Sequence, residues 1–149
     1  TPSDVLRNLM PEKIRKEFQH QLYSDPEIAL ASPMMSGVVP ALREIVMRGI
    51  PFVLITRRKD PEVAAQLLKR HGLWPTFFHE KNTFFVMDPE DKNVKASELG
   101  LTHYLDDELR VLNVLNYVEN KFLFDKYNSF PDMTLYPRIR SWQEFLEKI

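Results

Sequence analysis

The stretch "IPFVLITRRKDPEVAAQLLKRHG" at residues 50–72 decides the fold class. It begins with a continuous run of β-branched and aromatic residues, of the kind found in strands that are buried on both faces. After Thr56 come three basic residues, and then Asp60 and Pro61 mark a helix start with an N-cap carboxylate and a proline at the first helical position. Strand, turn and capped helix make a βα unit, which predicts parallel strands joined by crossover helices.

Beyond this βα unit the chain keeps alternating between apolar runs and helical patterns. The stretch "TFFHEKNTFFVMD" at 76–88 holds two aromatic pieces around a turn, so it is predicted as a hairpin or as one strand with a bulge. The following pieces are predicted as a short helix at "KASELG", a strand at "THYLDD", a helix at "ELRVLNVLNYVEN", a strand at "KFLFD" and a helix at "SWQEFLEKI", with Ser141 and Glu144 as a capping box. This alternation predicts an α/β fold with a Rossmann-like, doubly wound parallel sheet.

Residues 1–36 precede the first predicted core helix and carry a helical pattern of their own, in which Ile14, Phe18 and Leu22 recur every four residues. The stretch "VVPALREIVMRG" then predicts a helix that ends near Gly49 and buries one apolar face, made of Val39, Leu42, Ile45 and Val46. No interdomain linker is visible. We therefore expect a single domain, with a helical cap-like segment at 1–36 and an α/β core at 37–149.

Composition limits the classes of partner. The chain has 149 residues, 44% of them hydrophobic, which is enough apolar surface for the core of one domain. Lys and Arg number 20 against 21 Asp and Glu, so the net charge of -1 provides no field that attracts nucleic acid or an anionic membrane. There is no cysteine, and no apolar run approaches the roughly 20 residues of a membrane helix. We expect a cytoplasmic protein that acts through a specific site.

Polar side chains directly follow three of the apolar runs. Thr56 follows "PFVLI", Asp106 and Asp107 follow "THYL", and Asp125 follows "KFLF". Ligands of open parallel sheets bind beyond the carboxyl ends of the strands, so these residues are the candidates for a site. Two neighbouring carboxylates at such an edge need a positive partner, and a hard divalent cation such as Mg²⁺ is the usual one.

Each of these residues also has an interpretation that needs no ligand. Asp106 caps a helix that begins near Glu108, and Asp107 interacts favourably with the dipole of that helix. Thr56 satisfies backbone groups at the end of its strand with its hydroxyl. Lys95, in "KASELG", is a solvated helix residue. Taken one residue at a time, these interpretations are favoured over a catalytic one.

The order of the pieces resembles that of the haloacid dehalogenase (HAD) superfamily of phosphohydrolases. The matching pieces are "PFVLIT" with Thr56 for the second motif of the family, "KASELG" with Lys95 for the third, and "THYLDD" for the fourth. The resemblance covers most of the stretch from Gly37 to Asp125, and the tail "RIRSWQEFLEKI" is similar to the closing segment of nucleotidase-like members. Each motif is short, and the ordered set carries the resemblance.

The resemblance implies a Mg²⁺-dependent phosphatase that acts on a phosphomonoester, either a phosphorylated small molecule or a phosphoprotein. In that family an Asp nucleophile attacks phosphorus and forms an aspartyl-phosphate. Carried over to this chain, Thr56 binds a phosphoryl oxygen and Lys95 balances the charge of nucleophile and phosphate. Asp106 and Asp107 hold the Mg²⁺.

Three further basic residues lie close to these positions in the sequence. Lys92 is the less favoured substitute for Lys95. Arg57 and Arg58 follow Thr56 directly, and they either contact the substrate phosphate or are exposed loop charges.

The first motif of the family, an apolar strand that ends in Asp-x-Asp, is missing, because residues 1–36 contain no such strand. In the family fold this strand is central, between the strands that end here at Thr56 and Asp106. A gap there leaves two rows of backbone groups unpaired, at about 1–3 kcal/mol for each orphaned group. We therefore expect the strand to precede Thr1 in a longer protein. The alternatives are a strand from another chain, or an inactive relative that acts as a protein-binding or scaffold module.

Overall fold

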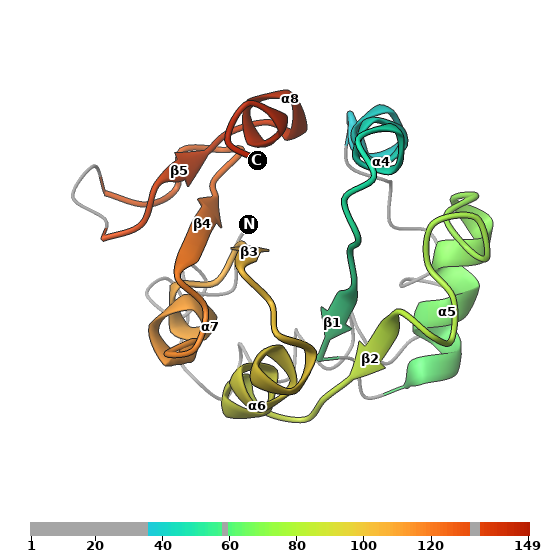
Figure 1. Cartoon of the computed structure of the whole chain (residues 1–149), viewed down its shortest axis with the longest axis horizontal. Coiled ribbons are helices and arrows are strands. Elements are labelled where there is room, and N and C mark those ends of the chain that lie inside the picture. The colour runs from blue at the N-terminus through green and yellow to red at the C-terminus, as the bar shows by residue number, and fades with distance from the viewer. Residues whose placement is uncertain (1–35, 58–59, 132–134) are drawn as a thin grey trace. The chain divides into compact units, whose positions relative to one another are not determined.

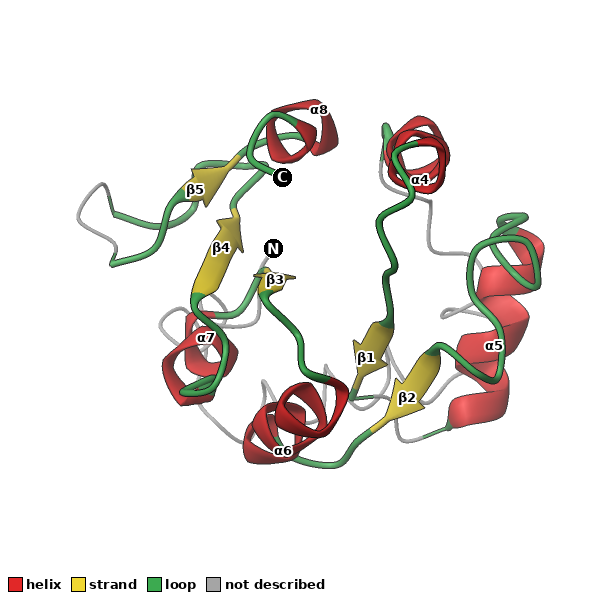
Figure 2. Cartoon of the chain, in the orientation of Figure 1, coloured by secondary structure: helices red, strands yellow, loops and turns green. Residues whose placement is uncertain are grey.

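The computed structural model describes residues 36–57, 60–131 and 135–149 (Figure 1). They fall into two compact units that part between Met87 and Asp88, called here the first and the second unit. Both units combine helices with parallel strands, which confirms the predicted α/β class (Figure 2). All but the last residue of the helical segment expected at 1–36, and Arg58, lie outside the described residues. None of the helices that the structure describes has the length and apolar character that a bilayer span requires.

The first unit contains one parallel pair of strands and two helices. In chain order its elements are α4 (Val38–Met47), β1 (Leu54–Thr56), α5 (Pro61–Arg70) and β2 (Thr83–Phe85). β1 and β2 run parallel, with Leu54 opposite Thr83. The predicted N-cap of α5 is confirmed, because one carboxylate oxygen of Asp60 accepts hydrogen bonds from the backbone N–H groups of Glu62 at 3.0 Å and Val63 at 3.2 Å.

An apolar cluster holds the first unit together. Its buried members are Leu42, Leu73 and Phe77, and partly buried residues of α4, α5 and the adjoining loops pack against them. On α4 the buried stripe consists of Ala41, Leu42 and Ile45. The prediction for Val46 is wrong: it lies in the last turn of the helix, past this stripe, and is 54% exposed.

Two predicted strand regions of the first unit are shorter in the structure. The run at 50–56 forms a strand only at Leu54–Thr56, since Pro51 has no N–H to pair and the ring of Phe52 packs edge-on against Phe78 at 5.6 Å. In the 76–88 stretch only the second aromatic piece is a strand. The hairpin prediction is wrong because the N–H groups of Phe77 and Phe78 both donate to the carbonyl of Leu73 at 2.9 Å, closing a turn that buries Phe77.

The second unit is built on a three-stranded parallel sheet. Its elements are α6 (Pro89–Leu99), β3 (His103–Asp106), α7 (Leu109–Val114), β4 (Asn120–Phe124), β5 (Arg138–Ile139) and α8 (Trp142–Leu146). β4 is the middle strand and pairs in parallel with β3 and β5. α7 packs against β3, β4 and α6, and α8 packs against β5 (Figure 1). The predicted helix at 108–120 ends early, at Val114, and the chain then buries Leu115 and Val118.

The core of the second unit is aromatic. Phe122, Phe124, Ile139 and Phe145 are buried together, and the rings of Phe122 and Phe145 meet edge to face at 5.6 Å. The predicted cap of α8 is confirmed in its first half, since Oγ of Ser141 accepts from the N–H of Glu144 at 3.1 Å. The Glu144 carboxylate reaches one residue further back than a capping box requires and accepts from the N–H of Arg140 at 2.8 Å.

Asp125, which directly follows β4, is a buried structural carboxylate. It is 1% exposed and accepts hydrogen bonds from the N–H groups of Ser129 at 2.7 Å and Phe130 at 3.3 Å. Its Oδ2 also lies 3.4 Å from Nε of Arg138, whose other nitrogens donate to Asn128, Phe130 and Pro131. Asp125 therefore connects β4, the following loop and β5.

We predict that Asp125→Asn lowers the free energy of unfolding by about 3–5 kcal/mol, because the change removes a buried negative charge that lies 3.4 Å from Nε of Arg138. Urea unfolding measures the loss. The matched control is Glu44→Gln, which removes an exposed ion pair to Arg48 at 2.9 Å and should cost less than about 0.5 kcal/mol. Equal losses in the two variants would contradict the structural role given to Asp125.

Candidate functional site

The carboxylate of Asp106 ends β3 and is held by two contacts within the second unit. Its Oδ2 accepts a hydrogen bond from the ammonium of Lys92 at 2.7 Å, and the two side chains are only 8% and 10% exposed. Its Oδ1 accepts from the backbone N–H of Glu108 at 2.9 Å, where α7 begins. The ion pair is therefore largely buried, and it connects the end of β3 to α6.

The lysine beside Asp106 is Lys92 and not Lys95. The buried positions of α6 are Pro89, Lys92 and Ala96, which follow one another at helical spacing. Lys95 lies off this stripe and pairs instead with Glu98 at 2.7 Å, in a contact whose side chains are 30% and 56% exposed. From the sequence, Lys92 is less favoured than Lys95 as the charge-balancing lysine. The signal for Lys92 is the small residue Ala96, which follows four positions later and therefore lies on the same face of the helix.

Asp107 is the more exposed of the two carboxylates. Partial burial of its carboxyl group, together with the negative charges of Asp106 and Glu108, raises the pKa of Asp107 from 3.8 to about 6. A backbone hydrogen bond and the charge of Lys92 oppose this rise. Because the residue as a whole is exposed, water screens part of these effects. The site thus holds more negative charge than Lys92 balances.

Tyr104 lies two residues before Asp106 and therefore on the same face of β3. The residue is 9% exposed, and its buried hydroxyl has no hydrogen-bond partner among the described residues. Burial, and secondarily the charge of Asp106, raises the pKa of Tyr104 further above its ordinary value. The side chain is accordingly a neutral hydroxyl with an unused donor close to the site, and sequence reasoning does not identify it.

Glu108 and Arg110 add a second ion pair at the start of α7. Nη2 of Arg110 donates to Oε2 of Glu108 at 3.0 Å, and the side chains are 34% and 22% exposed. Neither residue stands out in the sequence, because each looks like an ordinary first-turn charge of a helix. The pair increases the density of charge around Asp106 and Asp107.

The carboxylates of Asp106 and Asp107 suit a Mg²⁺ ion chemically. Mg²⁺ prefers oxygen ligands and is usually bound through one or two carboxylates together with water and substrate phosphate. Each carboxylate oxygen has two lone pairs, so Asp106 keeps acceptor capacity beyond its bonds to Lys92 and Glu108. In the described part of the chain no group of three or more His, Cys, Asp or Glu side chains could hold a metal.

Thr56 and Arg57 belong to the first unit. Thr56 is the last residue of β1, is half-buried, and accepts the N–H of Val86 with its carbonyl at 3.0 Å, next to the end of β2. Arg57 follows it and is also half-buried. The predicted strand-end position of Thr56 is confirmed. Its convergence with Asp106 stays a prediction.

Comparison with known proteins leaves the family open. No protein-family model matches the chain, and no curated protein or solved structure matches it significantly. The likeness to the HAD superfamily remains a resemblance of ordered motifs.

We predict that Lys92→Met costs about 3–5 kcal/mol of unfolding free energy, because it leaves the Asp106 carboxylate buried beside Tyr104 without its cation. Lys95→Met is the matched control on the same helix. It should cost less than about 1 kcal/mol, since its ion pair is exposed. Urea unfolding of both variants measures the difference, and a larger loss for Lys95→Met would reverse the assignment.

The raised pKa of Asp107 predicts a pH-dependent effect on stability in the absence of divalent metal. The folded protein holds the proton of Asp107 more tightly than the unfolded chain does, so the free energy of unfolding falls as pH rises from about 4 to about 6. Asp107→Asn removes this pH-dependent loss of stability, because asparagine does not titrate. The variant should be more stable than the parent at about pH 7 and should lose that advantage at about pH 4. Denaturant unfolding at both pH values tests it, and a variant less stable at neutral pH would contradict it.

Proposed function

We propose that this chain forms the core of a Mg²⁺-dependent phosphohydrolase that acts on a phosphomonoester, in the manner of the HAD superfamily. The observation that supports the proposal most is the pair Asp106 and Asp107 at the carboxyl end of β3, with Lys92 fixed against Asp106 at 2.7 Å. Phosphoryl transfer is mostly positioning and neutralisation of the phosphoryl oxygens, and these groups supply carboxylates for a cation and a fixed ammonium.

Each residue has a definite part in this proposal. Asp106 and Asp107 are the carboxylates that would hold Mg²⁺, which supplies positive charge to the phosphoryl oxygens. Lys92 takes over the charge-balancing part that the sequence resemblance gives to Lys95, because it is the lysine in contact with Asp106. The parts that the resemblance gives to Thr56, a hydrogen bond to a phosphoryl oxygen, and to Arg57, a contact with the substrate phosphate, stay predictions.

The nucleophile belongs to a further strand in this proposal. Among the described residues β1 pairs only with β2 and β3 only with β4, so each has an open edge. The carbonyl of Thr102 accepts from Asn120 on the β4 side at 3.2 Å, and alternate residues point their backbone groups to opposite edges. His103 and Leu105 thus present their N–H and C=O groups to the open edge. A parallel strand that ends in Asp-x-Asp would pair at this edge of β3 and add a fourth strand to the sheet of the second unit.

The metal part of the proposal can be tested on the chain itself. A titration with Mg²⁺, followed through the carboxyl carbon resonances of the Asp side chains, should shift Asp106 and Asp107 with a millimolar dissociation constant. Asp106→Asn should weaken binding at least about tenfold, equivalent to about 1.4 kcal/mol. Glu90→Gln, an exposed carboxylate on α6, is the control and should leave the constant unchanged. Shifts that persist in Asp106→Asn would remove the metal assignment.

The catalytic part needs a protein that includes the nucleophile strand. Such a protein should hydrolyse an aryl phosphate only with Mg²⁺, and Asp106→Asn should abolish the activity. Lys92→Met should lower kcat far more than Lys95→Met, because Lys92 is the lysine that contacts Asp106. Full activity in Lys92→Met would contradict its part in the reaction.

A second candidate is a catalytically inactive HAD-like domain that acts as a protein-binding module. The specific observation in its favour is that both oxygens of Asp106 already accept a hydrogen bond, one from Lys92 and one from Glu108. In that case the ion pair is purely structural. Loss of stability in Lys92→Met without any shift of Asp106 or Asp107 by Mg²⁺ would favour this candidate over the enzyme.

A further inference from the structure

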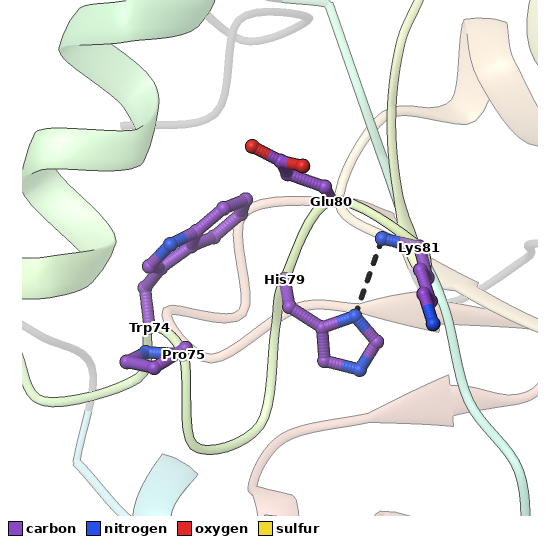
Figure 3. Close-up of a pocket in the computed structure, with 5 residues that line it drawn as sticks. All are labelled: Trp74, Pro75, His79, Glu80 and Lys81. Carbon is purple, nitrogen blue, oxygen red and sulfur yellow. Dashed lines mark hydrogen bonds between the residues drawn. The ribbon is translucent and has the colours of Figure 1, made fainter.

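The first unit has a pocket of about 550 Å³ on the segment between α5 and β2, lined by Trp74, Pro75, His79, Glu80 and Lys81 (Figure 3). This volume is in the range of small-molecule sites. None of its lining residues takes part in the proposed phosphohydrolase. These five residues all belong to the first unit.

Hydrogen bonds fix the backbone around the pocket. The side chain of Asn82 accepts from the N–H of His79 at 2.8 Å and donates to the carbonyl of Phe77 at 2.8 Å. The N–H of Asn82 donates to the carbonyl of His79 at 3.2 Å. Phe77 is buried in the apolar cluster of the first unit, so this loop is anchored to the core. The lining side chains therefore start from a pre-organised backbone.

His79 has one ring nitrogen left for a ligand. Its Nδ1 accepts the backbone N–H of Lys81 at 3.2 Å, as the dashed line in Figure 3 shows. In the neutral ring the proton is then on Nε2, which is a donor. A ligand with a hydrogen-bond acceptor can use this group.

The part of the pocket that Trp74 and Glu80 line favours a positively charged ligand. Figure 3 shows the Glu80 carboxylate on the side of the Trp74 indole, whereas the side chain of Lys81 extends away from Trp74. The face of an indole ring is the negative part of its quadrupole and attracts cations. No described residue forms an ion pair with Glu80. Trp74 and Glu80 thus line the same pocket with groups that prefer the same kind of ligand.

We propose that this pocket binds a small organic cation, with its ammonium or guanidinium group between the Trp74 indole and the Glu80 carboxylate. The Pro75 ring contacts the apolar body of the ligand, and Nε2 of His79 donates to an acceptor on it. The pocket is open to solvent, so each charged contact should contribute only about two- to fivefold to the binding constant.

The probes are n-butylammonium, n-pentanoate and 1-butanol, which share a butyl chain and differ in charge. Each is titrated into the full chain at constant ionic strength, and binding is followed by the indole N–H of Trp74 and the backbone amides of 79–81 in ¹H–¹⁵N spectra. We expect saturable shifts with n-butylammonium, and at least about fivefold weaker binding of the other two probes. Equal affinity for the three probes, or the absence of shifts at these residues, would overturn the proposal.

Two substitutions locate the charge preference. Glu80→Gln should weaken n-butylammonium binding by about two- to fivefold while leaving 1-butanol unaffected. Glu90→Gln is the matched control, since Glu90 is also an exposed carboxylate but lies on α6 and does not line the pocket, and it should leave both affinities unchanged. An identical loss in both variants would assign the preference to the net charge of the protein and would contradict a site at Glu80.

Discussion

The buried ion pair between Lys92 and Asp106 is the constraint on which the candidate site depends. Moving two charges out of water is costly, and the cost is recovered only when each charge has a close partner and further hydrogen bonds. Asp106 meets this condition through Lys92 on one oxygen and the start of α7 on the other. The pair therefore fixes where β3 ends and which face of α6 lies against it, and it holds the Asp106 carboxylate at the strand end.

A single ammonium does not balance all the negative charge at this position. Asp107 and Glu108 follow directly, and burial, together with the negative charges of Asp106 and Glu108, raises the pKa of Asp107 to about 6. Arg110 offsets Glu108 but lies beside it rather than beside Asp107. The proposed cation site uses such an excess of negative charge, whereas in a structural cap the favourable interaction of Asp107 with the dipole of α7 is its only role. The contrast with Asp125 is instructive, because that strand-end acid is fully satisfied by backbone N–H groups and Arg138.

The parts of the structure that the sequence predicts are those with local causes. The caps at Asp60 and Ser141 and the strand ends at Thr56 and Asp106 depend on residues only a few positions apart. The errors have tertiary causes. Phe77 has the pattern of a strand residue, but the core of the first unit takes its ring and the backbone turns instead.

The same difference between local and tertiary causes explains which residues of the candidate site the sequence does not predict. The choice between Lys92 and Lys95 depends on which face of α6 is buried, and the only sequence signal for that face is the spacing of Lys92 and Ala96. The two-residue strand β5 exists only through its pairing with β4 and has no local signal. The unused hydroxyl of Tyr104 becomes visible only when its surroundings are known.

The central claim is that Asp106 and Asp107 hold a divalent cation. Crystals of the protein soaked with Mn²⁺ and orthovanadate would test this claim most directly, through the anomalous signal of manganese. We expect a peak within about 2.3 Å of a carboxylate oxygen of Asp106. An intact Lys92–Asp106 pair with no peak at Asp106 or Asp107 would contradict it.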